Sequence, residues 1–144
     1  EEVGLKGAKT SAFKIDPDVA LAVDVSIAGD VPGVEPQESD LEMGEGVEIT
    51  MMQSEGRGLI TPEGVRNWLL ETAEEEEHEH QKGVWEGGAT DAAKINLVRE
   101  GVPTGSIGVP LRNMHSATEV VKVSDIEDTV EFLDDSFKSF ESYY

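Results

Sequence analysis

The chain carries an uninterrupted apolar run, VALAV, at residues 19–23, and an acidic residue, Asp24, follows it directly. Continuous apolar segments of this length are typical of strands that are buried on both faces, as in parallel sheets covered by helices. We therefore expect a strand here that is buried on both faces and that ends at Asp24.

Helix and strand patterns alternate along the rest of the chain. Thr61 and Pro62 suit the N-cap and the first position of a helix, and SDIE at residues 124–127 matches a capping box at the start of another. The alternation predicts a mixed α/β fold whose largely parallel sheet is sandwiched by helices. The expected strands are 19–23, 47–52, 83–85 and 106–109 (ended by Pro110), with a short extended segment at 120–123. The expected helices are 4–13, 61–77, 92–98 and one after residue 124 with Ile126, Val130, Leu133 and Phe137.

The chain of 144 residues is strongly acidic, with 31 Asp and Glu against 11 Lys and Arg and a formal net charge of −20. Its length suits one domain, and its 38% of hydrophobic residues is enough for a core. The charge argues against binding to nucleic acid or to an anionic membrane surface. No export leader and no apolar run of about 20 residues is visible, and cysteine is absent, so we expect a cytoplasmic protein without thiolate ligands.

Candidate ligand residues lie where α/β folds collect their ligands, at the ends of strands and in the loops that follow them. They are the pair Glu1 and Glu2, Asp24 after the apolar strand, and His115 after the strand that ends at Pro110. Carboxylates and imidazole without thiolate suit zinc, cobalt or manganese at a catalytic centre. In an irregular turn, one glutamate can bind the metal while its neighbour takes a proton from water. Each feature alone also has a plain structural interpretation: a solvated surface pair, a turn residue and a structural histidine.

Five sequence blocks together resemble one family of enzymes. They are EEVGLKGA at 1–8, AVDVSIAGDVPG at 22–33, EGGATDA at 86–92, GVPT at 101–104 and VPLRNMHS at 109–116. In this order, and over nearly the whole chain, they are similar to motifs of the tetrahedral aminopeptidases, which include glutamyl aminopeptidases. Members of this family are dinuclear metallopeptidases, and some carry an endoglucanase name.

The resemblance implies a role for each candidate residue. Glu1 matches the general base. Glu2 and His115 match two ligands of one metal ion, and Asp24 matches a ligand of the other. The resemblance thus implies two divalent ions, zinc, cobalt or manganese, that activate a bridging water for the removal of N-terminal residues from peptides.

The same resemblance implies a substrate pocket, partners and a fold. Thr90, Asp91 and Arg112 match positions where we expect contact with the substrate. The substrates would be peptides, and the chain would form a homo-oligomer, which in the family is commonly a tetrahedral dodecamer. The family has a zinc-peptidase-like α/β catalytic domain, and residues 1–144 match its C-terminal portion.

The sequence departs from the family pattern at its start. Family enzymes are more than twice as long, and upstream they carry a histidine ligand, an aspartate that bridges both metals and an inserted dimerisation domain. Of the metal ligands, this chain supplies Glu2, Asp24 and His115, and without a bridging carboxylate two closely spaced cations repel each other. We therefore expect the chain by itself to bind metal weakly and to be inactive. We favour its being the downstream part of a longer polypeptide over its completion by a separate chain.

Two other functions fit parts of the sequence. A non-catalytic remnant or assembly subunit would keep the fold and pack into a cage without chemistry. A glycoside hydrolase, as the endoglucanase name implies, would use Glu1 and Asp24 as a carboxylate pair, although aromatic residues that could stack on sugars make up only 6% of the chain. An upstream metal-binding block would favour the peptidase over both.

The acidity also predicts adaptation to high salt. Carboxylates spread along the chain, with a dense run at residues 74–77, repel one another at low ionic strength, whereas in molar salt the Debye length falls to about 3 Å and screens them. We expect the urea midpoint of unfolding to rise between low-salt buffer and molar KCl. A midpoint that does not rise would mean that the chain is simply an acidic domain from a mesophile.

Overall fold

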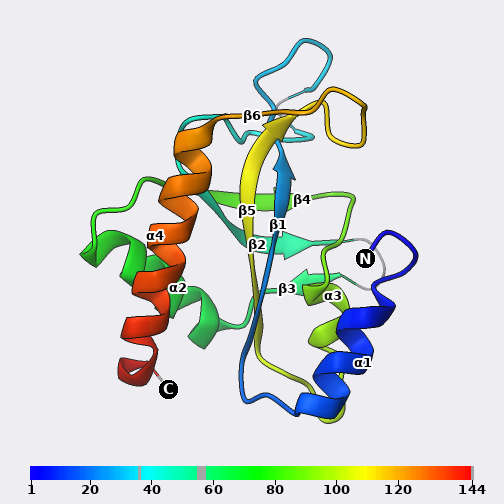
Figure 1. Ribbon diagram of the computed structural model, residues 1–144, viewed down its shortest axis with the longest axis vertical. Coiled ribbons are helices and arrows are strands. Elements are labelled where there is room, and N and C mark those ends of the chain that lie inside the picture. Colours follow the sequence, from blue (N-terminus) through cyan, green and yellow to red (C-terminus); the bar gives the residue numbers. More distant parts are fainter. Residues whose placement is uncertain (36, 55–57, 144) are drawn as a thin grey trace.

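The sheet is built on the expected apolar strand and on a second strand that lies beside it. The computed structural model describes residues 1–35, 37–54 and 58–143, and Figure 1 labels its elements. In chain order these are α1 (Lys6–Ile15), β1 (Ala20–Ile27), β2 (Val47–Gln53), β3 (Leu59–Ile60), α2 (Glu63–Glu75), β4 (His80–Trp85), α3 (Ala92–Ile95), β5 (Thr104–Arg112), β6 (Val120–Val121), α4 (Val123–Ser139) and a 3-10 turn, η2 (Phe140–Ser142).

Strands β1 and β5 form a parallel ladder that starts with Ala20 opposite Thr104 and continues in register to Ile27. β1 confirms the strand expected at the apolar run, and it continues past Asp24. It lies at one end of the strand order β1-β5-β2-β3, and Val23 and Ile27 are 54% and 49% exposed. The expectation that this strand is buried on both faces is therefore wrong, because at the sheet edge part of one face is left uncovered.

The remaining pairings make the sheet mixed. β4 pairs with β2 in parallel, whereas β3 and β5 pair with β2 antiparallel, and β6 adds a short antiparallel pair at the end of β5. The two long ladders, β1–β5 and β2–β4, are the parallel ones. This agrees with the largely parallel sheet that the sequence predicts.

Helices cover both faces of the sheet (Figure 1). On one face α2 and α4 pack over Val47, Ile49 and Ile107, and Trp68 and Phe132 are fully buried there. On the other face α1 and α3 pack against β1 through small side chains, which are Ala12, Ala20, Ala22 and Ala92. The α/β sandwich that the sequence predicts is confirmed. No described helix is long and apolar enough to cross a membrane.

Several helix ends differ from the predicted ones. Thr61, expected as the N-cap of α2, instead donates its hydroxyl to the Thr50 carbonyl at 2.5 Å, and so holds the start of the helix against β2. α3 is only four residues long, shorter than the expected 92–98. α4 begins at Val123 without a side-chain cap, so Ser124 does not form the predicted capping box.

β5 runs through Pro110, which the sequence predicts as its end. The amide of Ala28 donates to the Leu111 carbonyl at 2.9 Å. The backbone N–H and C=O groups of odd-numbered β5 residues therefore point toward β1, and the backbone of Pro110 points toward the strand on the other side of β5. On that side β2 pairs only as far as Gly108, and β6 begins to pair at Leu111. Proline is tolerated because no ladder partner there requires its missing N–H.

Helix α4 turns much of its apolar surface outward. Ile126, Val130 and Phe137, by which the sequence predicts this helix, are 42%, 60% and 66% exposed. The buried residues of the helix are mostly polar or acidic, and they are Asp125, Thr129, Phe132 and Ser136. Polar contacts therefore help to attach α4 to the rest of the fold. One of them is the 2.7 Å hydrogen bond from the Gly44 N–H to the Asp125 carboxylate.

A carboxylic acid lies in the interior of the sheet. Glu48 of β2 is fully buried, its Oε1 accepts the Thr50 hydroxyl at 2.7 Å, and its Oε2 has no hydrogen-bond partner among the described residues. Gly83 and Gly108 make room for it, since a Cβ on either would come within 2.4 Å of a carboxyl oxygen. Burial raises the pKa of Glu48 to about 8, so that the group is neutral at pH 7.

Glu48→Gln is expected to flatten the pH dependence of stability. Between pH 4.5 and about 8, the unfolded chain has lost this proton while the folded chain keeps it. Stability therefore falls as pH rises through this range, by up to about 1.4 kcal/mol per pH unit from this one group. Urea unfolding across the range measures the slope, and the exposed Glu45→Gln is the matched control. Equal slopes for Glu48→Gln and the unchanged chain would contradict the assignment.

Candidate active site

A hollow of about 500 Å³ opens beside β1. Its polar lining comes from Glu1 and Glu2 at the N-terminus, Asp24 on β1 and Asp91 just before α3. The apolar part of the wall consists of Leu21, Ala22, Val23 and Ile95. All the polar side chains in this lining are acidic, so carboxylate groups are concentrated in this hollow.

The first five residues form a tight turn. The Glu1 carbonyl accepts the N–H of Gly4 at 3.0 Å and that of Leu5 at 2.8 Å, and φ is +106° at Gly4 and +57° at Leu5. Leu5 is buried and anchors the turn. Adjacent side chains point to different faces in a regular strand or helix, whereas this irregular backbone lets both Glu1 and Glu2 line the hollow.

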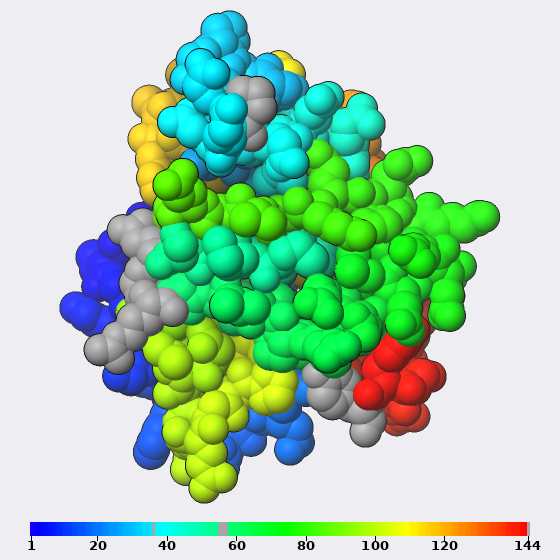
Figure 2. Space-filling model, turned by 180° about the vertical axis from the view of Figure 1, so that it is seen from behind, coloured from blue at the N-terminus to red at the C-terminus, as the bar shows by residue number. Residues whose placement is uncertain are grey.

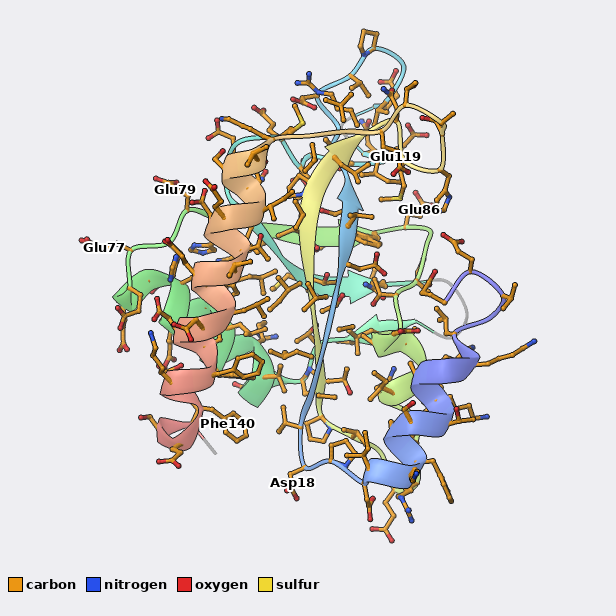
Figure 3. The ribbon with its side chains drawn as sticks, in the orientation of Figure 1. Asp18, Glu77, Glu79, Glu86, Glu119 and Phe140 are labelled. Atoms are coloured by element: carbon orange, nitrogen blue, oxygen red, sulfur yellow. The ribbon has the colours of Figure 1, made fainter. Side chains whose placement is uncertain are left out.

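His115 lies in the loop after β5 and contacts the N-terminal turn. Its Nε2 lies 3.2 Å from Oε1 of Glu2, and the two side chains are 71% and 72% exposed. The backbone of His115 is left-handed, with φ +61°, and its N–H donates to the Glu119 carboxylate at 2.7 Å; Figure 3 labels Glu119 in this loop. The structure therefore brings together Glu2 and His115, which are far apart in the sequence, at the open rim of the hollow.

Burial and neighbouring charges raise the pKa of two carboxyl groups. For Asp24 burial is the main cause; the negative charges of Asp91 and Glu2 add to it, and His115 opposes it. For Glu1 burial is again the main cause, and the negative charges of Asp24 and Glu2 raise its pKa further. These groups are therefore within electrostatic reach of one another.

Thr90 and Asp91 are neighbours with different surroundings. The buried hydroxyl of Thr90 lies 3.1 Å from Ser106 Oγ and accepts the Gln53 amide N–H at 3.1 Å, and its backbone N–H donates to Gln53 Oε1 at 3.0 Å. This network ties the segment before α3 to β2 and β5. Asp91 lines the hollow, and its buried Oδ1 has no hydrogen-bond partner among the described residues. The structure thus places Asp91, but not Thr90, at the hollow wall.

Arg112 is paired with an acid outside the hollow. Its Nε donates to Oδ1 of Asp30 at 3.0 Å and its Nη2 donates to Oδ2. Hydrogen bonds from the guanidinium are the main cause that lowers the pKa of Asp30. Arg112 is not among the described residues that line the hollow, and its expected contact with substrate stays a prediction.

The donor types at the hollow suit a divalent cation. Glu2, Asp24 and His115 offer carboxylate oxygens and an imidazole nitrogen, which is the donor set of zinc, cobalt and manganese sites. Among the described residues, however, no three His, Asp or Glu side chains are grouped so that they could hold one ion. The described residues therefore do not form a complete metal site.

The other two histidines lie away from these ligands. His78 Nε2 is 3.0 Å from the Asp135 carboxylate of α4, and its ring packs edge-on against Phe132. His80 Nδ1 lies 3.1 Å from the His78 carbonyl at the start of β4. Neither lines the hollow.

Three partners of the site residues could not be assigned from the sequence. Asp30 lies in the block at 22–33, but its pairing with Arg112 spans 82 residues and leaves no local pattern. Gln53, the partner of Thr90, and Glu119, the partner of the His115 N–H, carry no motif of their own. Only the folded chain reveals these contacts.

Comparison with known proteins gives a family match. The model of the M42 glutamyl aminopeptidase family matches residues 1–132. The glutamyl aminopeptidase of Lactococcus lactis subsp. cremoris is 37% identical over 133 residues, which are 92% of this chain and 35% of that protein.

Solved structures agree with this match. An aminopeptidase from the archaeon Desulfurococcus kamchatkensis superposes with a TM-score of 0.89 and 45% identity over 95% of this chain and 38% of that one. The Pyrococcus horikoshii TET1 peptidase, which can assemble into a tetrahedron or a large octahedral shell, gives a TM-score of 0.74 and 28% identity over 94% of this chain and 37% of that one.

The chain spans little more than a third of the length of these proteins. The family match nevertheless includes every segment that supplies a candidate residue: the N-terminal turn, β1, the start of α3 and the loop after β5. The chain belongs to the M42 glutamyl aminopeptidase family.

Proposed function

We propose that this chain carries part of the active site of a metal-dependent aminopeptidase that removes N-terminal residues from peptides. The observation that supports the proposal most is the contact of Glu2 with His115 at the rim of a hollow lined by Glu1 and Asp24. Like charges gathered in one hollow repel one another and raise one another's pKa. Such an arrangement costs stability unless a cation binds there, which favours a metal site over a purely structural cluster.

The surroundings of each residue support its proposed role. Glu2 and His115 would hold one divalent ion and Asp24 would help to hold a second, with zinc, cobalt or manganese as candidates. When bound, such ions activate water and polarise the scissile carbonyl group. Glu1, whose pKa burial and Asp24 raise, is a stronger base than an ordinary glutamate; it takes a proton from the attacking water and passes it to the leaving amine.

The hollow suits a peptide with a free N-terminus. An α-ammonium group is attracted by the acidic wall, whereas a free carboxylate is repelled. The unpartnered Oδ1 of Asp91 can accept a hydrogen bond from such a group, and Leu21 and Ile95 offer apolar contact beside it. Thr90 supports Asp91 through its bonds to Gln53.

The chain supplies only part of such a site. A bridging carboxylate, which two closely spaced cations need, would have to come in addition to the described residues of the hollow. We therefore propose that the isolated chain binds metal weakly and does not turn over substrate. The likeness to the TET1 peptidase supports assembly of the complete protein into a homo-oligomer such as a tetrahedral dodecamer.

A chimera tests the proposed function. Residues 1–132 would replace the matching segment of the Lactococcus lactis glutamyl aminopeptidase. We expect hydrolysis of glutamyl-p-nitroanilide that is lost with EDTA and restored by zinc or cobalt, with no activity on cellulose. Glu1→Gln in the chimera should lower kcat by about 100-fold or more, because the general base is lost, while its metal content is unchanged.

The controls separate the alternatives. Glu45→Gln, which changes an exposed glutamate outside the hollow, should leave the chimera active. A folded, metal-loaded chimera without activity would favour a non-catalytic remnant, and an active Glu1→Gln would exclude Glu1 as the base. If the chimera does not fold, zinc titration of the isolated chain decides the ligand set: His115→Ala should weaken binding and His80→Ala should not.

Removal of the Asp24 charge is expected to lower the pKa of Glu1. The negative charge of Asp24 opposes ionisation of Glu1, so Asp24→Asn makes the base easier to deprotonate. Carbon-13 NMR of the glutamate carboxyls follows the titration. Asp18→Asn, an exposed site at the opposite end of β1 from the loop with Glu119 (Figure 3), is the control. An unchanged Glu1 titration in Asp24→Asn would show that the two groups do not share the hollow.

A further inference from the structure

An ion pair outside the hollow joins the end of β5, where the His115 loop begins, to the loop after β1. Arg112 is the last residue of β5, and Asp30 lies in the loop after β1. The pair is two-pronged, from Nε to Oδ1 at 3.0 Å and from Nη2 to Oδ2. The Asp30 side chain is only 20% exposed and that of Arg112 37%. Two-pronged and partly buried pairs are stronger than ordinary surface pairs.

The pair lies where the backbone pairing of β1 with β5 ends. At that end the amide of Ala28 donates to the Leu111 carbonyl at 2.9 Å. Asp30 and Arg112 follow closely, and the loops after both strands leave the sheet together at the top of Figure 1. From behind, Figure 2 shows the cyan loop after β1 projecting above the green band of β4. The ion pair is therefore a side-chain link between two loops that backbone pairing no longer joins.

The loop that carries His115 is attached through Arg112. Within this loop the His115 N–H donates to Glu119 at 2.7 Å, and β6 closes the loop by pairing Val120 with Arg112. The loop of residues 113–119 thus starts directly after Arg112, and its far end, Val120, pairs back with Arg112. A change in how Arg112 is held would move His115 with the loop.

We propose that Arg112 and Asp30 are positioning residues that hold the His115 loop at the rim of the hollow, so that His115 meets Glu2. The importance of this contact for metal binding rests on the function proposed above. Arg112 thereby has a task other than contact with substrate, because its guanidinium already donates to Asp30 from Nε and Nη2.

Histidine NMR of the 144-residue chain tests the proposal without metal. The chain has 3 histidines, so labelling with nitrogen-15 histidine reports on His115, while His78 and His80 serve as internal references. The variants are Arg112→Gln and Asp30→Asn. The matched control is Arg99→Gln, since Arg99 is 39% exposed, also pairs with an acid at 2.8 Å and lies elsewhere, between α3 and α1.

The expected result is selective. Arg112→Gln and Asp30→Asn should shift or broaden the ring signals of His115 alone, Arg112→Lys should restore them in part, and Arg99→Gln should leave them unchanged. The proposal is wrong if His115 keeps its original signals in both Arg112→Gln and Asp30→Asn. It is equally wrong if all the histidines broaden together, because general loosening of the fold would then be the cause.

Cobalt separates this proposal from the proposed function. Co²⁺ added to the unchanged chain should broaden the His115 signals and spare those of His80, and Arg112→Gln should bind Co²⁺ about tenfold more weakly, as is typical when the support of a ligand is lost. Equal affinity would overturn the effect of positioning on metal binding. If Co²⁺ leaves His115 unchanged, its role as a ligand is wrong, whereas the metal-free spectra still decide whether Arg112 positions it.

Discussion

The parallel pairing of β1 with β5 is the constraint on which the rest of the site depends. Because the strands run in the same direction and in register, the loops after them leave the sheet at the same end (Figure 1). Asp24 lies on one strand, and the loop after the other carries His115 toward the N-terminal turn. If β1 and β5 paired antiparallel over the same eight residues, the His115 loop would lie at the opposite end of this ladder, roughly 25 Å away at about 3.3 Å per residue.

The sheet face that carries Asp24 is polar, and a second acid in the same row, Glu48, adds no charge at neutral pH. Asp24, Gly108 and Glu48 lie in one row across β1, β5 and β2. An ionised Glu48 there would add a further negative charge about 10 Å from Asp24, two strand spacings away. Its raised pKa keeps it neutral. Further along β2, the Gln53–Thr90 bonds satisfy buried polar groups that would otherwise cost stability.

Local sequence patterns predict which segments form helices and strands, whereas long-range packing determines where each element lies in the sheet and which side chains it exposes. The apolar run before Asp24 is a strand as expected, because side-chain composition determines that locally. Its edge position, which exposes Val23, depends on which strands pair and is invisible in the sequence. Pro110 stays within β5 because neither β2 nor β6 pairs with it. In the site, residue types indicated the candidate ligands, but the partner of Arg112 is set by a contact between distant loops.

Negative charge acts on this molecule in two ways that salt affects differently. Most of the 31 acidic residues contribute to a diffuse repulsion that dissolved ions screen. Around the hollow, Asp24 and Asp91 are half-buried, so mobile ions screen their charges less, whereas Glu1 and Glu2 are exposed. A cation bound beside Asp24, as proposed above, would offset the repulsion there, and binding to the folded state alone would stabilise the fold by mass action. High salt and the proposed divalent ion would therefore act at different places: salt screens the exposed surface carboxylates, whereas the ion would offset the charge around Asp24.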